Sequence, residues 1–139
     1  MNGIAHLAVT VKDMEKSMHF YTHALGLKKV FDIPHPETKK PWIEYLYLGG
    51  RNFVELFYDG KADNPWKPNQ CGFNHICLEV DDIHKACEKV TKAGYKLDDE
   101  PKQGLDFNWQ AWVRDPDGIR IELMQIDPKS PQAKAMSGK

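Results

Sequence analysis

The sequence predicts an α+β fold built from two tandem βαβββ modules, because two of its segments occur twice. Residues 6–13 (HLAVTVKD) are echoed by residues 75–82 (HICLEVDD), and residues 52–57 (NFVELF) by residues 119–124 (IRIELM). Each copy of the first segment opens with a histidine, and each copy of the second contains a glutamate. The chain has 139 residues, the length of one compact domain, so the two modules are expected to pack together or against another chain.

The first module is predicted to open with a strand over residues 3–11. Its odd-numbered positions, such as Leu7 and Val9, are apolar. Successive side chains of a strand point to opposite faces. His6 and Thr10 are therefore expected on the face that turns away from the apolar side chains.

A helix is expected next, with Asp13 as its N-cap and Gly26 as its stop signal. Apolar residues recur along this helix at a helical spacing, at Met14, Met18, Tyr21 and Leu25. Three strands complete the module, at residues 28–33, 42–48 and 52–58.

The second module repeats this order. A strand over 74–80 is followed by a helix from Asp82 to Gly94, and further strands are expected at 95–98, 108–114 and 119–126. The modules then span residues 3–58 and 73–126 of a single domain and are joined by a linker over 59–72. The polar tail, residues 127–139, is expected to be disordered.

Four potential metal ligands share the face that carries no helix. They are His6, Glu55, His75 and Glu122. A single histidine or glutamate in a strand is most often a surface residue, but four at duplicated positions on one face favour a shared site. Two buried glutamates without a partner would be costly, and a divalent cation compensates their charge. The sequence therefore predicts a His2Glu2 metal centre. His19 and His23 also stand four residues apart, but no carboxylate accompanies them.

The overall composition excludes several other classes of protein. The net charge of −1 and the pI near 6.6 give no basic surface for nucleic acid. The mean hydropathy is −0.60, and no apolar run reaches the length of a membrane span. The first strand begins too early to leave room for a signal peptide. Three cysteines with no zinc-site or disulfide spacing indicate reduced thiols, so a cytoplasmic protein is expected.

The order of elements, the paired histidines and glutamates, and the turn from Asp115 to Gly118 resemble the vicinal oxygen chelate superfamily. Within it, glyoxalase I (lactoylglutathione lyase) of the short bacterial type is the most similar member in pattern. The resemblance covers about residues 4–126. It implies a cupped mixed sheet with helices on its outer face and an enzyme of the lyase or isomerase type. It also implies a homodimer in which the site is shared between subunits.

The resemblance also implies a chemistry. A divalent metal, with Ni²⁺ or Co²⁺ favoured over Zn²⁺, Mn²⁺ or Fe²⁺, would bind an α-hydroxycarbonyl or hemithioacetal. Glu122 and Glu55 would be the catalytic carboxylates, moving a proton between neighbouring carbons through an enediolate.

Alternatives within the superfamily stay open at this point. An isomerase or epimerase acting on another α-hydroxycarbonyl or an acyl thioester is the first alternative; a dioxygenase or an antibiotic-resistance binding protein is less favoured. Epimerases typically have glutamine at the position of Glu55, and a metal-free binding protein would not need all four ligands.

The expected glutathione contacts differ from those of glyoxalase I. Thr10 stands where that family usually has an arginine, and Asp59 where it usually has an asparagine. Thr10, Asp59, Lys102 and Trp112 are the candidate substrate-binding residues. A small-molecule substrate is expected, with or without glutathione.

Overall fold

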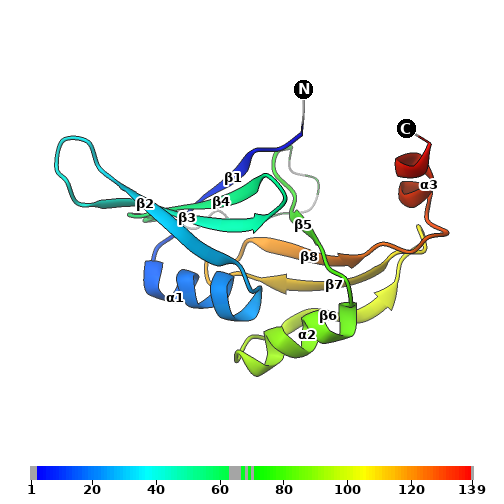
Figure 1. Cartoon of the computed structure of the whole chain (residues 1–139). Helices are drawn as coiled ribbons and strands as arrows, with labels where there is room; N and C mark the ends of the chain where they lie inside the picture. The colour runs from blue at the N-terminus through cyan, green and yellow to red at the C-terminus, as the bar shows by residue number, and fades with distance from the viewer. Residues whose placement is uncertain (1–2, 63–66, 68, 70, 139) are drawn as a thin grey trace. The chain divides into compact units, whose positions relative to one another are not determined.

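In the computed structural model, residues 3–62, 67, 69 and 71–138 are described. The chain divides into two compact units, Met1–Asp63 (unit 1) and Asn64–Lys139 (unit 2). Each unit contains its own four-stranded mixed sheet, as Figure 1 shows. The predicted α+β class with two repeated modules is confirmed.

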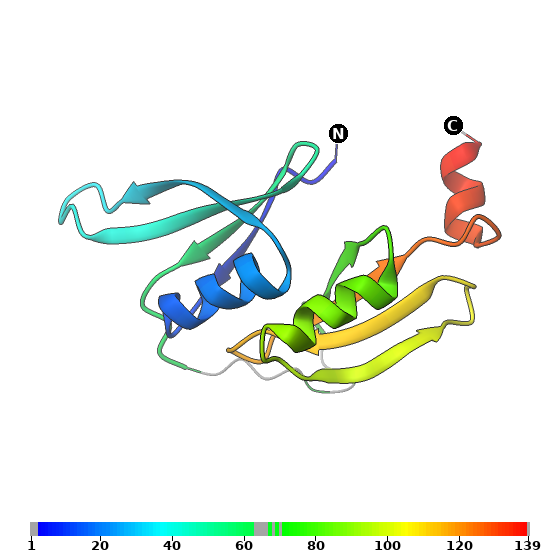
Figure 2. The same cartoon turned by 60° about the horizontal axis from the view of Figure 1, so that its bottom comes forward.

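Unit 1 forms one sheet with the strand order β1-β4-β3-β2. Its elements are β1 (His6–Thr10), α1 (Met14–His19), the π-helix η1 (Phe20–Ala24), β2 (Lys28–Pro34), β3 (Pro41–Gly49) and β4 (Asn52–Phe57). The first strand pairs in parallel with the last one, and the other pairs are antiparallel. The helical segment follows β1 and lies along one face of the sheet (Figure 2).

Unit 2 repeats this topology, with the strand order β5-β8-β7-β6. Its elements are β5 (Ile76–Glu79), α2 (Ile83–Lys92), β6 (Leu97–Gln103), β7 (Trp109–Arg114), β8 (Arg120–Gln125) and α3 (Pro131–Ser137). Again the first strand pairs in parallel with the last one, and the remaining pairs are antiparallel.

Strand β6 differs from the sequence prediction, which ended it at residue 98. The structure continues this strand to Gln103, through acidic residues and Pro101 that have low strand propensity. It is the edge strand of its sheet, and its pairing with β7 has register shifts on both sides of Asp99. An edge position tolerates proline and bulges, so the pairing with β7 extends the strand beyond its local preference.

Both predicted helix starts are confirmed. The Asp13 carboxylate accepts a hydrogen bond from the backbone N–H of Lys16 at 3.1 Å, and Asp82 accepts one from Lys85 at 3.0 Å. The predicted stop at Gly26 has a φ of 83°, a conformation that glycine adopts without strain. Among the described residues, no helix is long and apolar enough to cross a membrane.

The first helix buries a different stripe from the predicted one. Its second half is the π-helix η1, where the N–H of Leu25 donates to the carbonyl of Phe20, five residues earlier. The buried residues are Ser17, Phe20, Tyr21 and Ala24, of which Tyr21 alone was predicted, while Met14, Met18 and Leu25 are only partly buried.

The predicted inward faces of the strands form the apolar core of each unit. In unit 1 the buried strand residues include Val9, Leu46, Val54 and Leu56, and in unit 2 they include Ile76, Leu78, Ile121 and Leu123. Helix α2 packs against β6, β7 and β8 and contributes Ile83, Cys87 and Val90. In unit 2 the predicted ligands are thus on the sheet face opposite α2.

The tail expected to be disordered contains helix α3. Ser130 caps it by accepting a hydrogen bond from the N–H of Ala133, and Pro131 occupies the first turn, where its missing N–H costs nothing. The buried side chain of Asn108 connects this region to β7. Its Oδ1 accepts from the N–H of Asp127 at 2.9 Å, and its Nδ2 donates to Gln132 at 3.4 Å. These local hydrogen bonds give the tail a defined conformation, although its polar composition suggested disorder.

Candidate metal centre

Unit 1 brings His6 and Glu55 together on neighbouring strands. In the parallel ladder of β1 and β4, Glu55 is opposite Ala8, and His6 lies two residues earlier on the same face. His6 Nδ1 is 3.3 Å from Glu55 Oε1. The histidine side chain is 50% exposed, whereas only 5% of the Glu55 residue is exposed.

The carboxylate of Glu55 is surrounded by aromatic side chains. Tyr45 lies directly opposite it on β3, and a hydrogen bond to Glu55, with burial in support, raises the pKa of the Tyr45 phenol. The Tyr45 ring stacks on Phe31 with centroids 4.2 Å apart and meets Phe53 edge to face. Beside this aromatic cluster, only 7% of the Glu55 side chain is exposed.

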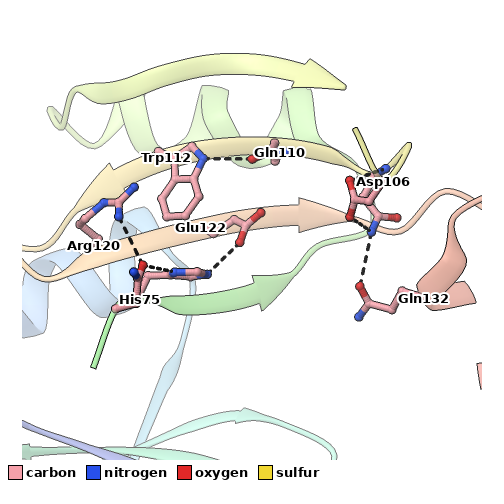
Figure 3. A network of polar contacts seen from close by, with 9 residues as sticks. His75, Asp106, Gln110, Trp112, Arg120, Glu122 and Gln132 are labelled. Atoms are coloured by element: carbon pink, nitrogen blue, oxygen red, sulfur yellow. Dashed lines mark hydrogen bonds and ion pairs between the residues drawn. The ribbon is translucent and has the colours of Figure 1, made fainter. Parts of the chain in front are cut away.

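Unit 2 contains an equivalent pair, His75 and Glu122 (Figure 3). In the parallel ladder of β5 and β8, Glu122 is opposite Cys77, just as Glu55 is opposite Ala8. His75 Nε2 is 3.1 Å from Glu122 Oε2. Glu122 is 6% exposed and the side chain of His75 is 30% exposed. The duplication seen in the sequence therefore reproduces the same strand register in both units.

Other polar and aromatic groups surround His75. Its Nδ1 lies 2.7 Å from Asn74 Oδ1, and its ring meets Trp112 edge to face with centroids 4.8 Å apart. The guanidinium of Arg120 lies over the Trp112 ring at 4.3 Å, and the indole N–H donates to Gln110 at 3.2 Å. Figure 3 shows these side chains together.

Sequence reasoning missed Asn74, Gln110, Arg120 and Tyr45 as neighbours of the ligand pairs. A strand-parity count could have found two of them, because Gln110 has the parity of Trp112 and Arg120 that of Glu122. Tyr45 needed the register of β3 against β4, which the sequence does not provide.

The donor set fits a divalent transition metal. Each unit places an imidazole nitrogen beside a buried carboxylate oxygen, and such nitrogen and oxygen donors suit Ni²⁺, Co²⁺ and Zn²⁺. A carboxylate removed from water needs a compensating cation. Throughout the described part of the chain, no group of three or more histidine, cysteine or acidic side chains could hold a metal ion. Each pair alone thus provides two ligands.

The four predicted substrate residues are in different environments. Thr10 is exposed at the end of β1, and Asp59 is exposed with a left-handed φ of 69°. Lys102 lies on the edge strand β6 and forms an ion pair with Asp99 at 3.0 Å. Only Trp112 contacts a predicted ligand in its own unit, through His75.

The rings of His19 and His23 stack with centroids 4.6 Å apart, and His23 Nδ1 lies 2.9 Å from the hydroxyl of Thr22. All three cysteines are free thiols, with Cys87 buried and Cys71 and Cys77 in exposed positions.

This chain has two βαβββ modules, and each places a histidine beside a glutamate on matched strands. The combination is typical of one class of proteins. Residues 3–123 match the model of the Glyoxalase/Bleomycin resistance protein/Dioxygenase superfamily, and the chain belongs to this superfamily.

Individual relatives of this chain share the name lactoylglutathione lyase. A probable lactoylglutathione lyase from a Synechocystis species is 34% identical over 131 residues, covering 91% of this chain and 97% of that protein. A lactoylglutathione lyase from Salmonella typhimurium is 32% identical over 126 residues, covering 88% and 91%. Among solved structures, a glyoxalase I variant from Zea mays is similar with a TM-score of 0.73 and 27% identity, covering 88% of this chain and 44% of that one.

The environment of Cys77 gives a test of the geometry in unit 2. Cys77 is exposed on one side, like Cys71, but partial burial of its thiol, together with the nearby Glu122 carboxylate, raises the pKa of the thiol to about 12. The thiolate is the reactive form, so at pH 8 iodoacetamide should modify Cys77 slowly despite this exposure. Glu122→Gln removes a negative charge, so the pKa of Cys77 should fall and its alkylation should accelerate.

Peptide mass spectrometry after timed alkylation measures these rates. The buried Cys87 is the internal control, because burial raises its pKa to about 11 and Glu122 is not among the causes. Equal rates for Cys77 in the wild type and in Glu122→Gln would contradict the placement of this carboxylate beside the thiol.

Proposed function

We propose that this chain is a metal-dependent enzyme of the glyoxalase I type, in which His6, Glu55, His75 and Glu122 together hold one divalent cation. The observation that carries the proposal is the duplicated pair: each unit places an imidazole nitrogen within 3.3 Å of a carboxylate that is at least nine-tenths buried. Two such pairs supply the two nitrogen and two carboxylate ligands of one site.

The charges of this ligand set suit proton abstraction beside a carbonyl. Two carboxylates neutralise a divalent cation, which leaves a nearly neutral site for a substrate on which one negative charge develops. When bound, the cation would supply Lewis acidity that stabilises this charge on the substrate oxygens. Ni²⁺ or Co²⁺ is the proposed activating ion, although Zn²⁺, Mn²⁺ and Fe²⁺ suit the same donors.

Glu122 is the proposed base. Its carboxylate is buried between His75 and Cys77, where little water can compete for a proton. Glu122 takes the proton from the substrate carbon, and Glu122 or Glu55 returns it to the neighbouring carbon. The partly buried Trp112 beside His75 limits access of solvent on one side.

The proposed substrate is a hemithioacetal that would be isomerised to a thioester, and its support is the name lactoylglutathione lyase that the relatives carry. The residues at the expected glutathione positions differ, because Thr10 supplies no cation and Asp59 adds a negative charge. Lys102 is a candidate cation for the anionic part of the substrate.

The two units are proposed to form the site in a homodimer, where His6 and Glu55 of one subunit meet the equivalents of His75 and Glu122 from its partner. Each unit has a small core, so association also buries apolar surface that a unit alone leaves exposed, including Phe31, Ile33 and Trp42.

Metal analysis tests the ligand set. After dialysis against Ni²⁺, Co²⁺ or Zn²⁺, the wild type should retain one ion per chain, and His6→Ala and His75→Ala should each retain much less. His84→Ala is the control, because His84 is exposed on α2, on the sheet face opposite His75 and Glu122. Wild-type metal content in His75→Ala would refute the assigned centre.

Kinetics test the role of Glu122. With methylglyoxal and glutathione, Glu122→Gln should lower kcat by about 10²–10⁴-fold, since the amide cannot accept the proton. Some metal should stay bound, because the amide oxygen is still a donor. Glu88→Gln, on the exposed face of α2, should leave kcat unchanged. An unaffected rate in Glu122→Gln would assign the base elsewhere, and no turnover by metal-loaded wild type would refute the glyoxalase assignment.

The Asp59→Asn variant tests whether glutathione is the cosubstrate. Removal of like charge should lower KM for the hemithioacetal with little change in kcat, because a ground-state repulsion is lost. Steady-state kinetics at several salt concentrations provide the check, since screening should shrink the difference. An unchanged KM at low salt would show that Asp59 does not face the anionic substrate.

Analytical ultracentrifugation tests the assembly. The active protein should sediment as a dimer at the concentrations used for kinetics. In addition, a mixture of His6→Ala and His75→Ala subunits should recover activity, because one of the two shared sites in the mixed dimer has all four ligands. A fully active monomer would rule out the shared site.

A further inference from the structure

We propose that Asn74 is a positioning residue that determines which nitrogen of His75 is available to the metal, and that Arg120 in turn holds the Asn74 amide in place. This inference rests on the proposed function, because it takes His75 as a ligand. It concerns side chains that all lie in unit 2 and are joined by the dashed contacts of Figure 3.

The orientation of the Asn74 amide follows from Arg120. A guanidinium group only donates hydrogen bonds. Arg120 Nη1 lies 3.4 Å from Asn74 Oδ1, so the oxygen of the amide faces Arg120, and a flipped amide would set two donors against each other. The guanidinium is itself held over the Trp112 ring at 4.3 Å by a cation–π contact.

The hydrogen on His75 follows from the amide oxygen. Oδ1 of Asn74 can only accept, and it lies 2.7 Å from His75 Nδ1, so Nδ1 carries the hydrogen and donates it. Nε2 lies 3.1 Å from Glu122 Oε2, which also accepts, so in the metal-free protein both ring nitrogens face an acceptor. A cation that takes the place of the hydrogen between Nε2 and Glu122 would bind the Nε2 lone pair and the carboxylate, while Asn74 keeps the hydrogen on Nδ1.

Within its described part, unit 1 has no equivalent of the Asn74–Arg120 contact beside its histidine. The residue before His6 is Ala5, which has no side-chain acceptor, and the position equivalent to Arg120 is Phe53. His6 turns Nδ1, rather than Nε2, toward its glutamate at 3.3 Å, and its side chain is 50% exposed against 30% for His75. The pair in unit 2 is therefore the more preorganised of the two, and His75 makes the larger contribution to metal affinity.

The tautomer of His75 can be read without any metal. In chelator-treated protein labelled with ¹⁵N-histidine, long-range ¹H–¹⁵N NMR in mildly alkaline solution distinguishes Nδ1–H from Nε2–H imidazoles. The His75 signals are identified by their loss in His75→Gln. All proteins in this test carry Glu122→Ala, which removes the acceptor beside Nε2. In that background His75 should show the Nδ1–H form, and adding Asn74→Ala should shift it toward the Nε2–H form. Asn74→Asp should restore Nδ1–H, because a carboxylate also accepts.

Two further variants separate positioning from general damage to the fold. Arg120→Met removes the donor but keeps bulk over Trp112, so it should shift the His75 tautomer partly. Ala5→Asn adds an amide at the equivalent place in unit 1 and should leave the His75 tautomer unchanged. Circular dichroism and urea unfolding verify that each variant is folded.

Metal affinity supplies the second readout. Loss of a partner that orients a ligand typically costs about 10–100-fold in affinity. Because Asn74 is exposed, we expect about 10-fold weaker Co²⁺ binding in Asn74→Ala, with recovery in Asn74→Asp. An Nε2–H tautomer in the Glu122→Ala background, or no change of tautomer on adding Asn74→Ala, would overturn the inference. An Nδ1–H tautomer that depends on Asn74, in a protein whose Co²⁺ affinity is unaffected by His75→Ala, would support the positioning role and refute the proposed metal centre instead.

Discussion

Each module depends on the parallel pairing of its first and last strands. In this ladder Glu55 is opposite Ala8 and Glu122 is opposite Cys77, so each glutamate shares a face with the histidine two residues before its partner. A slip by one residue would move the glutamate to the apolar core. The apolar residues on the other face, such as Val54 and Ile121, are fully buried and make that slip unfavourable. Core packing on one face thus fixes the positions of the polar groups on the other.

The two pairs have the same strand geometry but different surroundings. Glu55 lies among aromatic rings, with the Tyr45 phenol hydrogen-bonded to it. His75 lies among groups that can form several hydrogen bonds, with Asn74 and Arg120 on one side.

Much of this arrangement could be predicted from the sequence, because it depends on alternation and repetition. The parity of residues 6–11 and the recurrence of His and Glu were enough to predict the elements and to place His6 and Glu55 on one face. The extent of β6 could not be predicted, because its acidic residues form a strand only through pairing with β7. Asn74 could not be assigned a role either, because its contact with Arg120 joins residues 46 positions apart. Contacts between residues that are far apart in the sequence cannot be recognised from the local sequence pattern.

The π-helix η1 has a consequence for how the two modules diverged in length. The interval from the helix cap to the following glycine is one residue longer in the first module (Asp13 to Gly26) than in the second (Asp82 to Gly94). A π turn is the way a helix accommodates one inserted residue without breaking, and η1 lies within this interval. The surplus residue is therefore taken up in the helical connection, while the strands before and after it keep their register. The helical connection can gain or lose a residue while the histidine and glutamate stay matched. The two modules can therefore differ in length in this connection, which contains no ligand.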